Sequence, residues 1–168
     1  MPPARILVAY ASKRGSTAEV AGAIARVLSA DGHRVDLRSA AEVDDLDSYA
    51  GVVLGGSIYV GRWHPDALDF LELHSDGLTE LPVAIFAMGP RSLSDIEVAQ
   101  SRAQLDSSLA KVPDVTPATV AIFGGVVDPT KLRCPFNRLP ASDARDWAAI
   151  RAWAAEASRL FAAQAVPL

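Results

Sequence analysis

The sequence predicts a three-layer α/β sandwich, in which helices cover both faces of a five-stranded parallel sheet. Two observations lead to this prediction: five short apolar segments of strand length recur along the chain, and helical patterns alternate with them. Consecutive parallel strands need a crossover of a dozen or more residues, usually a helix, so this alternation favours a parallel sheet. The 168 residues contain no repeat and no interior linker. We therefore expect a single domain over residues 1–168.

The first half of the chain contains three predicted strands and one predicted helix. A continuous apolar run at residues 5–11 is typical of a strand buried on both faces. Apolar residues on one helical face predict a helix over 17–30, and an aspartate-glycine pair signals its end. A second strand follows at 34–40. After an acidic connection, the run at 51–56 ends in glycines and predicts a third buried strand.

The second half continues this alternation. Residues 65–74 carry apolar side chains at helical spacing, with a proline in the first turn, where proline is well tolerated. Residues 82–88 form another apolar strand, 94–111 a polar amphipathic helix, and 119–125 the fifth strand. An irregular stretch with three prolines precedes a long terminal helix over about 142–163. We interpret the tryptophans of that helix as packing residues.

Composition excludes several classes of function. The formal net charge of −4, from 16 basic and 20 acidic residues, gives no basic footprint for nucleic acid. No apolar run approaches the roughly 20 residues of a transmembrane segment. Because Cys134 is the only cysteine, no internal disulfide can form, and we expect a cytoplasmic location. The three histidines lack metal-ligand spacing, so no metal site is predicted.

A hydroxyl-rich loop, residues 12–17, joins the first strand to the first helix. A helix N-terminus presents unpaired N–H groups and about half a positive charge, so an anion there would meet backbone donors, three hydroxyls and two cations. The loop lacks the glycine spacing of triphosphate and dinucleotide sites, which favours a monophosphate. The alternative is a capping box, in which Ser16 and Glu19 only close the start of the helix.

Three further loops follow predicted strand ends. In open α/β sheets, ligands bind beyond the carboxyl ends of the strands, where these loops gather. The loop after the third strand carries Tyr59 and Trp63, aromatic residues that could stack on a flat ring. The turn at 88–92 and the glycine pair at 124–125 are small enough for close backbone approach. Together with the first loop, they predict a site that holds a phosphate at one end and a planar ring at the other.

The first loop resembles the flavodoxin phosphate motif, [ST]-x-T-G-x-[ST]. Ser12, Gly15 and Thr17 match it, and Arg14 stands at the middle threonine. Further segments are similar to the branch of flavodoxin-like proteins that includes the menaquinone-dependent protoporphyrinogen oxidases. They are residues 56–63, the Met88-Gly89-Pro90 turn, the Phe123-Gly124-Gly125 strand end, and Asp143-Ala144-Arg145-Asp146-Trp147. The third-strand loop has Tyr59-Val60 where those oxidases have Arg-Tyr.

This resemblance implies a flavodoxin-like fold with strand order 2-1-3-4-5 and a bound FMN, with the deazaflavin F420 as the alternative cofactor. It implies that the FMN phosphate binds residues of the first loop: Ser12, Lys13, Arg14, Gly15, Ser16 and Thr17. It implies that the isoalloxazine ring lies between the later loops, at Ser57, Ile58, Tyr59, Val60, Gly61, Trp63, Met88, Gly89, Pro90, Arg91, Gly124 and Gly125. No catalytic residue can be named from the sequence.

Three functions compete. The leading hypothesis is an FMN-dependent oxidoreductase, either similar to the protoporphyrinogen oxidases or linked to a quinone. The second hypothesis is an electron-transfer flavodoxin that docks a redox partner protein. A non-redox module such as a receiver domain is disfavoured, because no acidic residue ends the first strand. Cations fall in segments predicted to follow strand ends: Arg62, Arg91, Lys131, Arg133 and Arg138. They favour an anionic small-molecule substrate, unless they pair with Asp128 and Asp143.

Overall fold

The computed structural model describes residues 5–12 and 15–165. Five parallel strands form the central sheet in the order β2-β1-β3-β5-β6. A short strand, β4, pairs antiparallel with the end of β3. If the five long strands are numbered along the chain, this is the expected order 2-1-3-4-5, so that prediction is confirmed. No helix within the described residues has the length and apolar character needed to cross a membrane.

The strands and helices have the following bounds. The central strands are β1 (Arg5–Ala11), β2 (Arg34–Ser39), β3 (Gly51–Tyr59), β5 (Val83–Met88) and β6 (Thr119–Phe123). The short strands are β4 (Arg62–Trp63), β7 (Val126–Val127) and β8 (Ser142–Asp143). The helices are α1 (Ser16–Ala30), α2 (Pro65–Leu73), α3 (Ser75–Leu78), α4 (Asp95–Leu109) and α5 (Trp147–Ala165). Three 3₁₀ turns complete the chain: η1 (Ala40–Glu42), η2 (Pro129–Lys131) and η3 (Phe136–Arg138).

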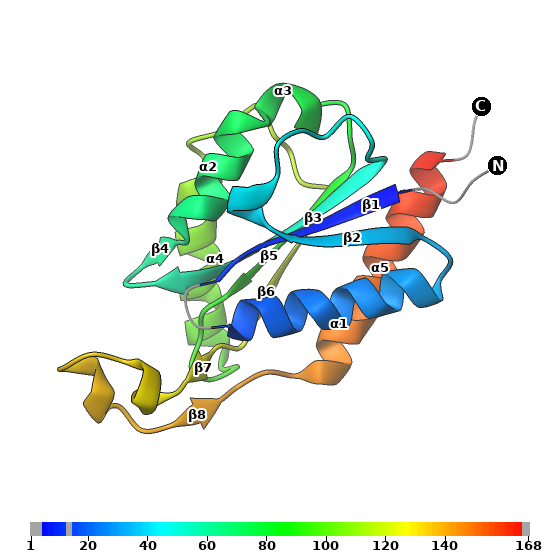
Figure 1. Ribbon diagram of the computed structural model, residues 1–168. Coiled ribbons are helices and arrows are strands. Elements are labelled where there is room, and N and C mark those ends of the chain that lie inside the picture. Colours follow the sequence, from blue (N-terminus) through cyan, green and yellow to red (C-terminus); the bar gives the residue numbers. More distant parts are fainter. Residues whose placement is uncertain (1–4, 13–14, 166–168) are drawn as a thin grey trace.

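The sheet separates two hydrophobic cores, because successive side chains of a strand point to opposite faces. On β1, Leu7 packs into the core under α2 and α4, whereas Ile6 and Val8 pack into the core under α1 and α5. Figure 1 shows α1 and α5 side by side on one face, with α2 and α4 on the other. The expected three-layer sandwich is therefore present. The predicted apolar stripe of α5 is buried at Ile150, Ala154, Ala157 and Phe161, and it is partly buried at Trp147.

Two boundaries differ by three or more residues from those predicted, and the others by one or two at most. β3 continues three residues beyond the predicted end at Gly56, because its last residues pair with β4 as a hairpin. The terminal helix begins at Trp147 rather than near residue 142. Its N-terminus is capped by Asp146, whose carboxylate accepts from the Ala149 amide at 3.1 Å. Residues 142–143 instead form β8, which pairs with β7.

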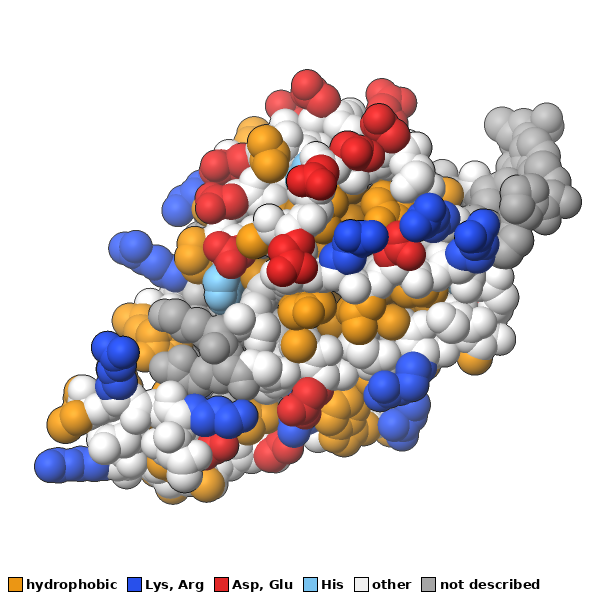
Figure 2. Space-filling view, in the orientation of Figure 1, with side chains coloured by type: hydrophobic (Ala, Val, Ile, Leu, Met, Phe, Trp, Pro, Cys, Tyr) orange, Lys and Arg blue, Asp and Glu red, His pale blue; other side chains and the backbone are white. Residues whose placement is uncertain are grey.

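After β6 the chain leaves the central sheet, and β7 and β8 pair as a separate two-stranded sheet. We call residues 126–143, from the start of β7 to the end of β8, the excursion. It contains η2 and η3, and in Figure 1 it projects at the lower left, beyond the carboxyl ends of the central strands. Figure 2 shows a group of acidic side chains over α2, α3 and the connection before β3, at the opposite end of this face, while others lie toward the excursion. The excursion itself carries three cationic residues between Asp128 and Asp143. They are Lys131, Arg133 and Arg138.

Candidate functional site

A cavity of about 380 Å³ lies at the carboxyl ends of the central strands, where the sequence places the site. Eleven of the predicted site residues line it: Ser12, Ser16, Thr17, Ser57, Ile58, Tyr59, Val60, Met88, Gly89, Arg91 and Gly125. They come from the β1–α1 loop, the end of β3, the β5–α4 loop and the end of β6. Four segments that are distant in sequence therefore meet at one cavity.

The β1–α1 loop forms the polar end of the cavity. Gly15 is the N-cap of α1 and has φ 91°, a left-handed conformation that glycine adopts without steric cost. The Gly15 amide donates to Ser12 Oγ at 2.9 Å, and this bond closes the turn. No side chain caps the helix. Its first amides are thus left without a side-chain acceptor at the point where an anion would bind.

The capping-box alternative is wrong. Glu19 does not return to the helix start; its carboxylate pairs with Arg145 at 2.6 Å. Ser16 makes no side-chain cap either, and it lines the cavity. The hydroxyls of this loop are therefore available to a ligand. Lys13 and Arg14, which were also predicted to contact the phosphate, lie outside the described residues.

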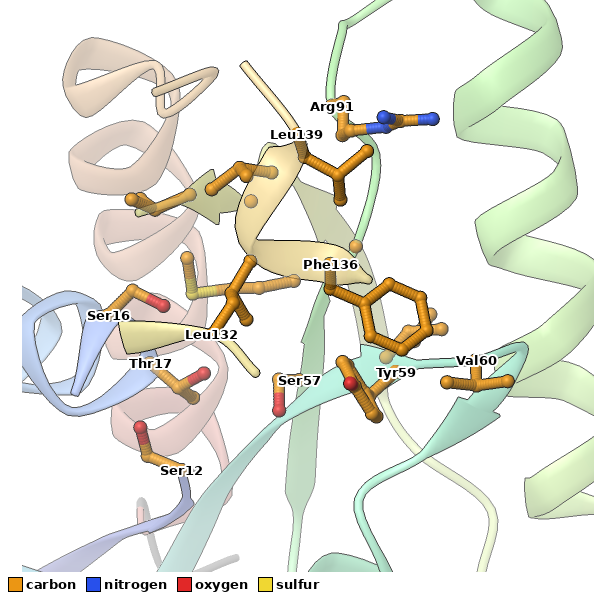
Figure 3. Close-up of a pocket in the computed structure, with 16 residues that line it drawn as sticks. Ser12, Ser16, Thr17, Ser57, Tyr59, Val60, Arg91, Leu132, Phe136 and Leu139 are labelled. Atoms are coloured by element: carbon orange, nitrogen blue, oxygen red, sulfur yellow. The ribbon is translucent and has the colours of Figure 1, made fainter. Parts of the chain in front are cut away.

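Thr17 is the most informative residue of the polar end. It is fully buried, and its Oγ1 has no hydrogen-bond partner among the described residues. In Figure 3 the Thr17 hydroxyl lies close to those of Ser12 and Ser16 on the same side of the cavity. Because an unsatisfied buried hydroxyl costs about 1–3 kcal/mol, an orphan of this kind at a cavity wall indicates a missing polar ligand.

The other end of the cavity is apolar. Tyr59 and Val60, from the end of β3, form its lip, and the Tyr59 ring meets the Phe136 ring edge to face at 6.1 Å between centroids. Val60 has φ 50°, a left-handed conformation that is rare for a β-branched residue. Backbone strain of this kind concentrates at ligand sites. Tyr59 remains 37% exposed, so its ring can accept a further stacking partner.

Sequence reasoning missed the wall that the excursion contributes. Phe136 from η3 and four further apolar residues line the cavity: Val126, Val127, Leu132 and Leu139. In Figure 3, Leu132, Phe136 and Leu139 lie over the cavity from this segment. The available signal was a set of apolar residues spaced three to four apart within a proline-containing stretch after the last strand. That signal does not say what the residues cover.

Five predicted site residues do not line the cavity. Trp63 is only 3% exposed, packs in the core under α2, and donates its indole N–H to the Gly56 carbonyl at 3.1 Å. The stacking role expected for Trp63 is thus corrected to a packing role. The remaining four are Gly15, Gly61, Pro90 and Gly124. They shape the backbone next to the cavity; for example, the Pro90 carbonyl accepts from the Gly125 amide at 2.8 Å.

Arg91 is the cation that lines the cavity, and no aspartate or glutamate does so among the described residues. Its side chain extends toward the α4 side in Figure 3. Three exposed arginines of the surrounding segments do not line the cavity: Arg62, Arg133 and Arg138. Asp143 does not neutralise them, since its carboxylate is taken by Arg145 at 2.7 Å. Hydrogen bonds from Arg145 hold the pKa of Asp143 below its usual value.

The histidines have structural roles. His33 Nε2 lies 3.0 Å from Ser158 Oγ, and His64 Nδ1 accepts from the Asp66 amide at 3.1 Å, which caps α2. His74 packs against the Phe70 ring with 4.7 Å between centroids. No group of three or more histidine, cysteine, aspartate or glutamate side chains within the described part of the chain could hold a metal ion.

Comparisons with known proteins agree with the family resemblance seen in the sequence. A family model described as a flavodoxin domain matches residues 7–138. Protoporphyrinogen IX dehydrogenase (quinone) of Escherichia coli K12 is 26% identical over 86 residues, which cover 50% of this chain and 48% of that protein. The chain thus spans about half the length of the curated relatives that it matches.

Solved structures resemble the whole chain at low identity. Oxidised flavodoxin 2 from Bacillus cereus has a TM-score of 0.60 and 22% identity, with 96% of this chain and 99% of that chain covered. Rubredoxin oxygen:oxidoreductase from Desulfovibrio gigas has a TM-score of 0.65 and 15% identity, with 99% of this chain and 38% of that chain covered. At such identities, the likeness shows the fold.

Proposed function

The chain belongs to the flavodoxin domain family, and from this premise we propose that it is an FMN-dependent oxidoreductase with its cofactor in the cavity described above. Its family and fold are consistent with a flavin-binding redox protein. The choice of FMN rests on the two unlike ends of the cavity, and the choice of an enzyme rather than a carrier rests on the charges at the cavity. A phosphate suits the polar end, and a flat ring suits the apolar end.

The observation that carries the proposal is the orphaned hydroxyl of Thr17. A phosphate at the start of α1 would accept a hydrogen bond from Thr17 Oγ1, and it would also meet the uncapped amides of the first helical turn. Ser16 lines the same wall and offers a second hydroxyl. These donors fit a monophosphate, and the residues present therefore suit FMN.

The apolar end suits the isoalloxazine ring. Tyr59 and Phe136 offer aromatic surface, while Leu132 and Leu139 cover the cavity from the excursion. The Ser57 hydroxyl supplies a polar group between the two ends (Figure 3). When bound, FMN would supply the electron-transfer and hydride-transfer chemistry. The residues of this chain would bind it, orient its ring and limit access to its edge.

The charges at the cavity favour an enzyme over a carrier. An electron carrier of this fold is expected to surround its flavin with acidic residues that dock a basic partner. Here Arg91 lines the cavity, and none of the described aspartates and glutamates does. Cations near a cavity attract anionic small molecules by electrostatic steering. We therefore propose an anionic substrate or acceptor, and a quinone-linked reaction agrees with the name of the Escherichia coli relative.

Flavin binding is tested by titrating the purified protein with FMN, riboflavin and F420 and following the visible absorbance and the flavin fluorescence. We expect saturable one-to-one binding of FMN, and weaker binding of riboflavin because it lacks the phosphate. A preference for F420 would replace FMN as the cofactor and leave the fold unaffected. Binding of none of the three would overturn the proposed function.

A further inference from the structure

The segment Asp143–Trp147 is the one part of the family resemblance that the cavity does not use. At its centre, Arg145 makes three side-chain hydrogen bonds. Its guanidinium donates to both carboxylate oxygens of Asp143, at 2.9 and 2.7 Å, and to Glu19 at 2.6 Å. Its Cζ atom also lies 4.9 Å from the centroid of the Trp147 ring. Only 11% of the Arg145 side chain is exposed, so these contacts occupy most of its surface.

The backbone that carries Arg145 is fixed to the end of the sheet. The Ala144 amide donates to the Gly125 carbonyl at 3.0 Å. Gly124 allows this approach, because a Cβ atom at that position would lie 2.0 Å from the Ala144 carbonyl oxygen. Just beyond, Asp146 caps α5. Arg145 therefore extends from a rigid base between β8 and α5.

The two carboxylates that Arg145 binds belong to the elements that carry two walls of the cavity, the start of α1 and the excursion. Glu19 lies in the first turn of α1, two residues after Thr17 of the polar end. Asp143 lies in β8, where it pairs directly with Val126, which lines the apolar end. Arg145 is thus a side-chain link between the helix that begins at the phosphate-binding loop and the hairpin that anchors the excursion.

Arginine is well suited to this link. Its planar guanidinium binds one carboxylate through two parallel hydrogen bonds and still has donors for a second carboxylate, which a lysine ammonium cannot reproduce with fixed geometry. Stacking on Trp147 further restricts the rotation of the side chain. Arg145 thus joins the start of α1 to β8 through one ordered group.

We propose that Arg145 is a positioning residue that couples the order of the excursion to the order of the first turn of α1, and so holds the apolar wall of the excursion in place beside the polar end of the cavity. Its consequence for ligands rests on the proposed FMN site. The coupling itself is a property of the protein without ligand. It requires that a change in α1 be felt in the excursion, more than 100 residues away in sequence.

The test is hydrogen–deuterium exchange of the full chain without added flavin, resolved by peptide, on four proteins: the wild type, Glu19→Gln, Arg145→Leu and the double variant. Glu19→Gln weakens only the link to α1, because the amide oxygen can still accept from Arg145 but carries no charge, and it leaves the Arg145–Asp143 pair intact. We expect it to speed exchange in residues 126–143 by about two- to fivefold, because exposed ion pairs contribute up to about 1 kcal/mol. Arg145→Leu should speed exchange in both walls by more than this.

The double variant decides the coupling. Once Arg145 is gone, Glu19→Gln should add nothing to exchange in the excursion, since the two residues act through one contact. Arg145→Lys should fall between the wild type and Arg145→Leu. Arg102→Leu is the matched control: it removes an exposed arginine that pairs with Asp106 on α4, and both walls should exchange as in the wild type. Amides of β1 and β5 report any global loss of stability.

The proposal is overturned if Glu19→Gln changes exchange in α1 alone, if the two substitutions act additively on the excursion, or if exchange in β1 and β5 rises as much as in the excursion. These outcomes do not depend on flavin. A wild type that binds no flavin would overturn the proposed function, whereas the exchange cycle would still decide whether Arg145 couples the two walls.

Discussion

The two ends of the cavity are built in different ways. The polar end comes from one continuous stretch, the β1–α1 loop, in which Ser12, Ser16 and Thr17 are neighbours in sequence as well as in space. The apolar end is assembled from the end of β3, the β5–α4 loop and the excursion, which ends only at β8. A locally built site can be recognised from its sequence pattern. A site assembled from distant segments is visible only when the chain is folded.

The sharpest test of this contrast is Thr17→Val, which removes one hydroxyl and keeps a similar shape. We expect the FMN dissociation constant to rise by roughly ten- to a hundredfold, since a hydrogen bond to a charged group contributes about 1.5–3 kcal/mol. Riboflavin affinity should stay the same. The free energy of unfolding without flavin should be unchanged or higher, because an unpaired buried hydroxyl is lost.

Fluorescence titration with both flavins and urea unfolding measure these effects. Thr79→Val is the control, because the Thr79 hydroxyl donates to the Asp76 carbonyl at the C-terminal end of α3, outside the cavity lining. Equal weakening of FMN and riboflavin by Thr17→Val would mean that Thr17 supports the fold rather than a phosphate.

At the apolar end of the cavity, Phe136→Ala should have a smaller effect on flavin affinity, and one that discriminates less between FMN and riboflavin. Phe136 is 41% exposed and stacks edge to face on Tyr59. We expect FMN and riboflavin to weaken by the same factor, about two- to tenfold, because an aromatic contact contributes roughly 0.5–1.5 kcal/mol beyond its buried area. Leu73→Ala, at an exposed apolar position outside the cavity lining, should leave both affinities unchanged. A loss confined to FMN would place the phosphate, rather than the ring, near Phe136.

The cations give a third comparison. Arg91 lines the cavity and Arg62 does not, although both were predicted to lie near it. Arg91→Gln should slow reoxidation of the reduced flavin by a carboxylated acceptor a few-fold at low salt and affect a neutral quinone less, because steering acts on charge. The difference should shrink as salt shortens the Debye length to about 10 Å at 0.1 M.

Stopped-flow mixing with the two acceptors measures these rates, and Arg62→Gln provides the matched control with little expected effect. Equal slowing of both acceptors at every salt concentration would remove the steering argument. The protein would then be better described as a carrier.

The smallest expected effect concerns pH. Because its folded-state pKa is lowered by the hydrogen bonds from Arg145, Asp143 stabilises the fold above its unfolded pKa of about 3.9. This contribution is lost as the pH falls through the folded-state value. Urea unfolding between pH 6 and pH 2.5 should therefore show a wild-type advantage over Asp143→Asn that disappears at the acid end. The advantage should not exceed about 1 kcal/mol, since the carboxylate is half exposed.

The fold was largely predictable because its signals are local. Each buried strand is a continuous apolar run, and most helices carry an apolar stripe or a clear stop signal, so the five long strands and the four long helices were placed within a few residues. The short elements were not predicted. Strand β4 exists only because the chain turns back on the end of β3, and β8 exists only because β7 lies beside it.

Trp63 shows the limit of reasoning from a loop sequence. An aromatic residue after a strand can stack on a ligand or pack inward, and the sequence is the same in both cases. The β3–β4 hairpin turns Trp63 into the core, where its indole N–H finds the Gly56 carbonyl. Tyr59, on the same hairpin, stays at the cavity lip. The direction of each ring follows from the pairing of the strands.

The sequence by itself determined the layered sheet and the hydroxyl-rich turn at the start of α1, because each depends on residues that are adjacent along the chain. The strand order came from the family resemblance. Tertiary structure decided which side chains close the cavity and which ions pair. Leu132, Phe136 and Leu139 form a wall only where the excursion folds back over the strand ends. Arg145 reaches Glu19 only because β8 brings the start of α5 beside α1, across 126 residues of sequence, and pairings over such distances leave no local pattern to read.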